Sequence, residues 1–155
     1  MRRPLALAAL PLTLVLSACG ETPAPGSTAI EGEEASLVVE NAWVRTPPPG
    51  RDMTAGYFTV SANYNTELVS ATSAEARVIE LHTMAMDNNV MRMREVEGYD
   101  IRADEPLRLE SGGNHLMIFG LTDGTLEDGE LAVTLEFADG ETVETVLVVG
   151  VQAPG

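Results

Sequence analysis

The sequence has no lysine, one cysteine, two histidines and only 5% aromatic residues. With a single cysteine, no intrachain disulfide is possible. Beyond position 19, seven arginines stand against 24 Asp and Glu residues, a formal net charge of −17. Nucleic acids and anionic membrane surfaces are bound by basic faces, so we expect no nucleic-acid partner. The acidic balance instead favours solubility and the approach of cations or basic proteins.

Long apolar runs are also missing. The longest, Leu5–Leu16, has twelve nearly continuous apolar residues, whereas a helix needs about 20 to cross a bilayer core. It follows the basic start Met1-Arg2-Arg3 and precedes small residues, which is the pattern of a secretory signal peptide. The string Leu16-Ser17-Ala18-Cys19 resembles the lipobox of bacterial lipoproteins, in which the cysteine is acylated and becomes the first mature residue.

We therefore expect residues 1–18 to be a lipoprotein signal peptide and Cys19 to carry the lipid; an ordinary signal peptide is the alternative. The protein would be exported to the periplasm or outer cell face and anchored to a membrane. After Cys19, residues 20–36 are rich in Pro, Gly, Ser, Thr and Glu and offer little to bury, so 19–36 should form an acylated, disordered tether. Residues 37–151 are enough for one domain without disulfides.

From Leu37 onward the chain is typical of β-structure. Short runs of β-branched and apolar residues alternate with polar ones, and no stretch shows a convincing 3.6-residue period. Asp87-Asn88-Asn89 suits a hairpin turn, because asparagine tolerates positive φ. Many short strands at this spacing predict an all-β sandwich or small barrel. We predict strands at 37–45, 54–62, 67–73, 77–86, 90–96, 107–110, 115–121, 131–138 and 142–150.

The histidines and methionines are unevenly placed. Five of the seven methionines fall between residues 84 and 117; of the two histidines, His115 lies in this segment and His82 lies two residues before it. Side chains alternate faces along a strand, so residues two apart share a face. A hairpin that turns on Asn88-Asn89 would put Met93 diagonal to His82, and would oppose three pairs: His82 with Glu95, Met84 with Met93, and Met86 with Met91. Two imidazoles and several thioethers converge if the strand carrying His115 and Met117 docks beside this hairpin.

This set of side chains favours one metal. Thioethers are soft and uncharged and select Cu(I), and imidazole also suits copper. Zinc is usually held by cysteine, histidine and carboxylate. A blue-copper electron-transfer site needs a cysteine thiolate, and Cys19 lies in the lipid position. The residues alone indicate a thioether–imidazole Cu(I) site of unknown purpose, with structural histidines and core methionines as the alternative.

The spacing of these residues resembles that of the PCuAC family of periplasmic copper chaperones. The family pattern is a His, ten residues, a Met, twenty-one residues, and then His-x-Met. Here His82 is separated by ten residues from Met93, which is separated by twenty-one from His115-Leu116-Met117. The flanking strings Glu80–Met86, Val90–Arg94 and Gly112–Met117 also look typical. The likeness extends over roughly residues 38–150, most of the expected domain.

The resemblance implies a cupredoxin-like Greek-key β-barrel that binds Cu(I) in a solvent-accessible site at one end. It carries over His82, Met93, His115 and Met117 as ligands. It also implies delivery of copper to the CuA centre of cytochrome c oxidase subunit II, directly or with Sco-type proteins, and we expect a monomer. The roles of Met84, Met86 and Met91 are not covered by the resemblance, and both core packing and transient copper handling stay open for them.

Other classes of function find little support in the sequence. There is no G-x-S-x-G elbow and no glycine-rich phosphate loop, so we expect no enzyme. Two alternatives to a chaperone remain. One is a lipoprotein that sequesters Cu(I) as a buffer, and the other is a structural β-lipoprotein that binds no metal.

Overall fold

The computed structural model describes residues 34–121, 126 and 128–150. The expected signal peptide (1–18), Cys19 and all of the expected tether except residues 34–36 lie outside the described residues. In the described part every regular element is a strand, as the sequence predicts. Among these residues, no helix has the length and apolar character needed to cross a membrane.

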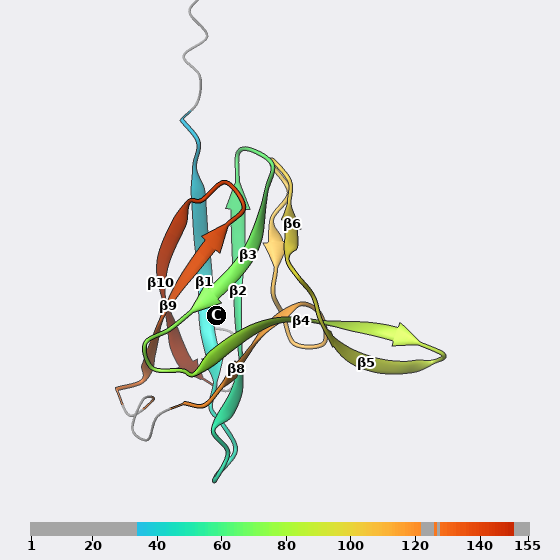
Figure 1. Ribbon diagram of the computed structural model, residues 1–155, viewed down its shortest axis with the longest axis vertical. Helices are drawn as coiled ribbons and strands as arrows, with labels where there is room; N and C mark the ends of the chain where they lie inside the picture. The colour runs from blue at the N-terminus through green and yellow to red at the C-terminus, as the bar shows by residue number, and fades with distance from the viewer. Residues whose placement is uncertain (1–33, 122–125, 127, 151–155) are drawn as a thin grey trace, which may run out of the picture. The chain divides into compact units, whose positions relative to one another are not determined.

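Ten strands pair edge to edge in one sheet that curls around its core (Figure 1). The order is β5-β4-β8-β2-β1-β10-β9-β3-β6, with β7 paired to β2. Among the strands of the described residues, β1 and β10 form the one parallel pair. The bounds are β1 Leu37–Arg45, β2 Met53–Ala62, β3 Thr66–Thr72, β4 Val78–Asp87, β5 Val90–Glu95, β6 Tyr99–Ile101, β7 Leu107–Arg108, β8 His115–Phe119, β9 Glu130–Phe137 and β10 Thr142–Gly150. The expected all-β barrel or sandwich is confirmed.

The predicted strand positions agree with this structure to within two residues at each end, and one strand was not predicted. The segment predicted at 107–110 is a strand only over Leu107–Arg108. The short strand β6, Tyr99–Ile101, was not predicted, because three residues are too few to show an alternation. The difference matters, since Tyr99 of β6 contacts the backbone of both histidines, as described below.

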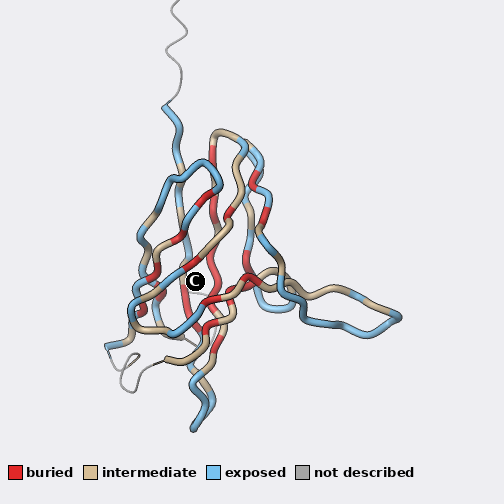
Figure 2. Tube along the Cα trace, in the orientation of Figure 1, coloured by how far each residue is buried: buried red, intermediate tan, exposed pale blue. Residues whose placement is uncertain are grey.

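Alternation along each strand separates a core face from an outer face. In β8, Leu116 and Ile118 are fully buried in the core, whereas His115 and Met117 point to the other side of the sheet. The buried positions gather along the inner face of the curled sheet (Figure 2). Its largest fully buried members are Phe58, Leu68, Ile101, Leu116, Ile118, Leu131, Leu135, Phe137 and Leu147. The histidines therefore sit outside the hydrophobic core, on a sheet that the core makes rigid.

The β4–β5 hairpin projects away from the packed strands (Figure 1). Its two-residue turn, Asn88-Asn89, has φ angles of 50° and 63°. Positive φ at both central residues defines a type I′ turn, whose twist matches that of the flanking strands. The turn fixes the register, which runs without a break from Asp87–Val90 to His82–Glu95. The three cross-strand pairs predicted from the sequence are confirmed.

Candidate metal centre

The two histidines are direct cross-strand neighbours. Strand β8 pairs with β4, and the register sets His82 opposite His115. Their ring centroids are 5.9 Å apart. His115 is 4% exposed and the His82 side chain 13% exposed, so both rings are largely shielded from water. The docking of the 115–117 strand beside the hairpin, on which the predicted site depended, is therefore present.

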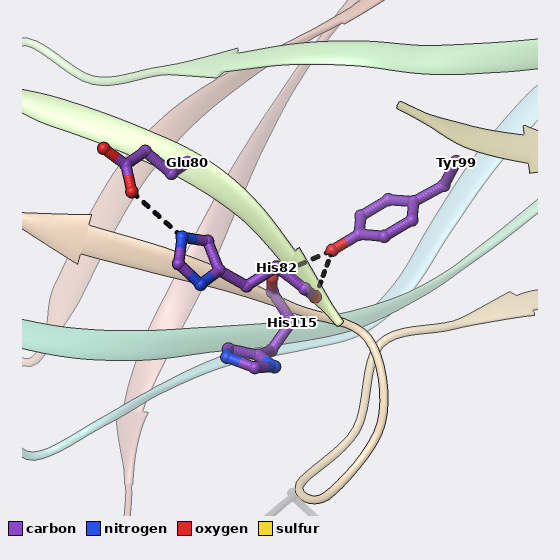
Figure 3. Close-up of polar contacts among 4 residues, drawn as sticks. All are labelled: Glu80, His82, Tyr99 and His115. Atoms are coloured by element: carbon purple, nitrogen blue, oxygen red, sulfur yellow. Dashed lines mark hydrogen bonds and ion pairs between the residues drawn. The ribbon is translucent and has the colours of Figure 1, made fainter. Parts of the chain in front are cut away.

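Each imidazole has one nitrogen held by an acceptor and one left over. The Nδ1 atom of His115 lies 3.0 Å from the carbonyl oxygen of Gly113, so it carries the proton and donates. In His82 the roles are exchanged: Nε2 lies 2.9 Å from a carboxylate oxygen of Glu80 (Figure 3). The other two nitrogens, Nε2 of His115 and Nδ1 of His82, are left free, and acceptors placed in this way orient metal-binding histidines in proteins.

The free nitrogen of His82 is the least satisfied polar atom at this site. Nδ1 is buried and has no hydrogen-bond partner. A buried polar atom without a partner costs about 1–3 kcal/mol. Figure 3 shows this nitrogen on the side of the His82 ring that faces His115. A bound metal ion would relieve the cost, so the observation fits a ligand role for His82.

Tyr99 ties the backbones of the two histidines together from the core side. Its hydroxyl donates to the carbonyl oxygens of His82, at 2.6 Å, and His115, at 3.0 Å (Figure 3). Burial raises the pKa of Tyr99 to about 12, so the hydroxyl keeps its proton at neutral pH. The spacing of the two strands at the histidine pair is held by this one side chain as well as by the sheet.

A cavity of about 460 Å³ opens beside the histidine pair. Three of the four residues singled out from the sequence, Met93, His115 and Met117, line it; His82 does not line it, but its ring is 5.9 Å from that of His115. Met84 and Met53 also line the cavity, so four thioethers face one space. The remaining lining residues are Arg45 of β1, Thr54, Ala55 and Tyr57 of β2, and the loop residues Pro48, Arg51, Ser111 and Gly112.

A row of aromatic rings crosses the outer face of the sheet from β1 to β4. Trp43 stacks on Tyr57 with ring centroids 4.5 Å apart. Tyr57 lies 6.4 Å from His115, which lies 5.9 Å from His82. The guanidinium of Arg45 sits 5.8 Å above the Tyr57 ring. Tyr57 and His115 both line the cavity, so part of the row forms its wall.

The donors around the cavity are soft. In the part of the chain that the structure describes, no three His, Cys, Asp or Glu side chains are grouped to hold a metal ion. The cavity and its neighbourhood offer two imidazole nitrogens and several uncharged thioethers instead. Such donors match a soft monovalent ion and suit hard cations such as Mg²⁺ or Ca²⁺ poorly.

The sequence matches the family model described as "Putative lipoprotein LpqE-like" over residues 37–149. The chain belongs to the LpqE-like family. A protein of Leifsonia xyli subsp. xyli, named "Putative lipoprotein Lxx21020", is 35% identical to this LpqE-like chain over 121 residues, which cover 76% of the chain and 72% of the relative.

Solved structures share the fold of this LpqE-like protein. The copper-bound PCuAC domain from PmoF2 superposes with a TM-score of 0.60 at 20% identity, covering 76% of the chain and 93% of that domain. The CuI form of DR1885 from Deinococcus radiodurans has a TM-score of 0.58 at 28% identity, covering 72% and 76%. The fold is that of PCuAC domains, so the expected cupredoxin-like architecture is confirmed.

The structure also revises the reading of two methionines in this LpqE-like protein. Core packing was one of two interpretations for Met84, Met86 and Met91. It is wrong for Met86 and Met91, which are 65% and 47% exposed on the projecting hairpin. Period-two alternation could not predict this exposure, because it assigns a side chain to a face of the strand but does not say whether other residues cover that face.

Three residues at the site escaped the sequence analysis. Glu80 could have been found, since it lies two residues before His82 and so shares its face. Met53 could have been found only by extending the predicted strand 54–62 by one residue. Tyr99 gave no signal, because its contact with the histidines depends on how β6 packs against strands far away in the sequence.

Proposed function

We propose that this protein is a metallochaperone that binds one Cu(I) ion through His82, Met93, His115 and Met117. The observation that carries the proposal is the histidine pair. Two imidazoles lie 5.9 Å apart, each oriented by an acceptor on one nitrogen, and the free nitrogen of His82 is buried without a partner. Met93 and Met117 line the adjoining cavity and supply the thioethers that make such a site selective for Cu(I).

The similar solved domains support the choice of metal. One is described as copper-bound and another as a CuI form. Thioether ligands carry no proton, and an imidazole that donates from one nitrogen keeps the other free to bind a metal ion. The role expected of the chain is therefore carriage of Cu(I), not chemistry on a substrate.

Release is favoured by the exposure of one proposed ligand. Met93 is 48% exposed on the hairpin, whereas His115 is 4% exposed. An acceptor could displace Met93 first and leave the ion held by the buried ligands until further bonds form. We propose that the acceptor is the CuA site of cytochrome c oxidase subunit II, reached directly or through Sco-type proteins. A sequestering protein would be expected to shield all its ligands.

An anaerobic titration tests the site. Purified protein competes for Cu(I) with a chromophoric chelator, and X-ray absorption counts the sulfur and nitrogen ligands. We expect a 1:1 complex with two sulfur and two nitrogen neighbours, and a loss of affinity of at least about tenfold in His115→Ala and in Met117→Leu. Val148→Ala, a change at another exposed apolar position, is the matched control. Unchanged affinity in both ligand variants would show that the site is elsewhere.

Transfer distinguishes delivery from storage. The Cu(I)-loaded protein is mixed with an apo CuA domain, and the copper content of each is measured after separation. We expect copper to move to the acceptor. Tight retention, with no transfer to a CuA domain or to a Sco-type protein, would favour the sequestration function.

We further propose that the domain is held at a membrane through an acylated Cys19, on the outer side of the cell. The support is the lipobox-like string ending at Cys19 together with membership of a family named as lipoproteins. Two or more acyl chains bind a protein stably to a bilayer. A Cys19→Ser variant should leave the membrane fraction or stay unprocessed. Equal membrane retention of a processed variant would contradict the proposal.

A further inference from the structure

One face of the β4–β5 hairpin is made of methionine. Met84 pairs with Met93 and Met86 with Met91, and we call these four side chains the thioether face. Met84 and Met93 line the cavity beside the histidines. Residues two apart in a strand share a face, so Met86 and Met91 extend the same surface outward to the turn. The face thus runs continuously from the proposed copper site to the tip of the hairpin.

The pairing brings the backbones of the two methionines in each pair close together. The amide of Val96 donates to the carbonyl oxygen of Leu81, which makes Leu81–Val96 a hydrogen-bonded pair. Hydrogen-bonded and non-hydrogen-bonded pairs alternate along an antiparallel ladder, so both methionine pairs are of the non-hydrogen-bonded kind. Their Cα atoms are then about 4.5 Å apart, and flexible thioether side chains from such a pair can reach one ion.

The opposite face of the hairpin has a different character. Arg92 and Arg94 both pair with Asp87, at 3.3 and 3.0 Å. These ion pairs lie on the face that alternation assigns to residues 83, 85 and 87, away from the thioethers. The hairpin is therefore charged on one side and thioether-bearing on the other, and the thioether side is not covered: Met86 is 65%, Met91 47% and Met93 48% exposed.

We propose that Met86 and Met91 form an outer, weakly binding Cu(I) site, and that copper moves between this site and the histidine pair by way of Met84 and Met93. This inference rests on the proposed function and adds the route by which the ion enters and leaves. Successive pairs are separated by two residues, which is about 7 Å along a strand. At each step a bond from Cu(I) to a sulfur of one pair breaks as a bond to a sulfur of the next forms. The copper stays Cu(I), and no proton or electron is transferred.

The ligands of the outer and inner sites indicate that the outer site binds Cu(I) more weakly. The outer pair offers two thioethers on a solvated ribbon, whereas the inner site offers two oriented imidazoles and two thioethers. Two soft neutral donors alone hold Cu(I) less tightly than four. A weak, exposed first site raises the local concentration of the ion beside the inner site, and so it affects the rate of loading and unloading more than the final affinity.

Methyl NMR of protein labelled with ¹³C at the methionine methyl groups reports on every pair separately. The probe is Cu(I) alone, added under anaerobic conditions to the intact protein. We expect the first equivalent to shift the methyl signals of Met93 and Met117. Excess Cu(I) should then shift or broaden the signals of Met86 and Met91 together. If these two signals do not respond to excess Cu(I), the outer site does not exist, whatever the inner signals do.

Stopped-flow transfer supplies the second measurement. In the Met86→Leu/Met91→Leu variant, side-chain volume is nearly kept and both outer sulfurs are lost. We expect Cu(I) transfer to a chelator to slow by about tenfold or more, as for loss of a site that concentrates the ion, while the equilibrium affinity stays within about twofold of wild type. Val90→Leu, at the same tip, is the control and should transfer at the wild-type rate.

The two measurements separate this inference from the proposed function. If the methyl signals of Met93 and Met117 do not shift, the inner site is refuted. The signals of Met86 and Met91 would still show whether the outer pair binds Cu(I). Normal inner binding with an unchanged transfer rate in the double variant would overturn the relay and leave the chaperone proposal standing. Slowed transfer with an equal loss of affinity would also overturn it, because that result indicates damage to the inner site.

Discussion

The Tyr99→Phe substitution removes the hydroxyl that joins the two histidine-bearing strands and leaves the ring in the core. Tyr99 is 5% exposed, and its hydroxyl donates to the carbonyl oxygens of His82 and His115 at 2.6 and 3.0 Å. Losing one partner of a buried hydrogen bond costs about 1–3 kcal/mol, so we expect the free energy of unfolding at neutral pH to fall by that amount. Because the hydroxyl positions both ligand backbones, Cu(I) affinity should also fall about tenfold.

The same hydroxyl gives the wild-type protein a specific sensitivity to alkali. The pKa of Tyr99 is raised from 10.0 in the unfolded chain to about 12 in the folded one. The stabilisation from keeping Tyr99 neutral is therefore complete below pH 10 and is lost as the pH rises towards 12. That rise in pKa corresponds to about 2–3 kcal/mol. The variant lacks this dependence, so the stability difference between the two proteins should shrink over this range.

Urea unfolding of the metal-free proteins, followed from neutral pH to about pH 12, measures both effects. Tyr64, whose pKa is also raised to about 12, contributes equally to both proteins and cancels in the difference. Competition titration with a chelator measures the affinity. The proposed role of Tyr99 in joining the two strands would be refuted by two results together: a stability difference between wild type and variant that stays constant up to about pH 12, and an unchanged Cu(I) affinity.

Three further predictions concern other parts of the chain. Glu80→Gln removes the charge that orients the His82 ring, and we expect Cu(I) affinity to drop about tenfold with little change in the unfolding midpoint; a larger change in stability than in affinity would contradict this. Gly56→Ala adds a Cβ 2.7 Å from Leu147 Cδ2, which should destabilise the fold by about 1–3 kcal/mol in denaturant unfolding, and a neutral result would mean that the core has room. The backbone amide of Glu141 donates to the Asp139 carboxylate and holds its pKa below 3.8. As the pH falls through that lowered pKa, we expect the wild type to lose stability relative to Asp139→Asn. A stability difference between the two proteins that does not change with pH would contradict this.

The register of the β4–β5 hairpin could be predicted from the sequence, because it depends only on residues close together in the chain. Alternation assigns the faces of residues 82–86 and 91–95, and an Asn-Asn pair tolerates the positive φ of a type I′ turn. Together these two facts set the register, and Met84–Met93 and Met86–Met91 follow from it. A slip by one residue would have moved every methionine to the other face, so the agreement is sensitive to the details.

The completion of the site could not be predicted from the residues alone. His115 comes to His82 because β8 docks on β4, a pairing between segments separated by the whole β5–β7 region. Alternation describes each strand but not its neighbours in the sheet, and only the family resemblance supplied that step. The exposure of Met86 and Met91 also depends on tertiary structure, since the hairpin extends past the strands that might have covered it (Figures 1 and 2).

The row of rings across β1, β2, β8 and β4 gives the protein its own optical probe. Trp43 is the only tryptophan, is 7% exposed, and stacks on Tyr57, which lies between it and His115. Metal binding at His115 is thus separated from the largely buried Trp43 fluorophore by the Tyr57 ring alone. Emission from Trp43 can follow occupancy of the histidine pair in unlabelled protein, in real time, without the coloured chelators that compete for the ion.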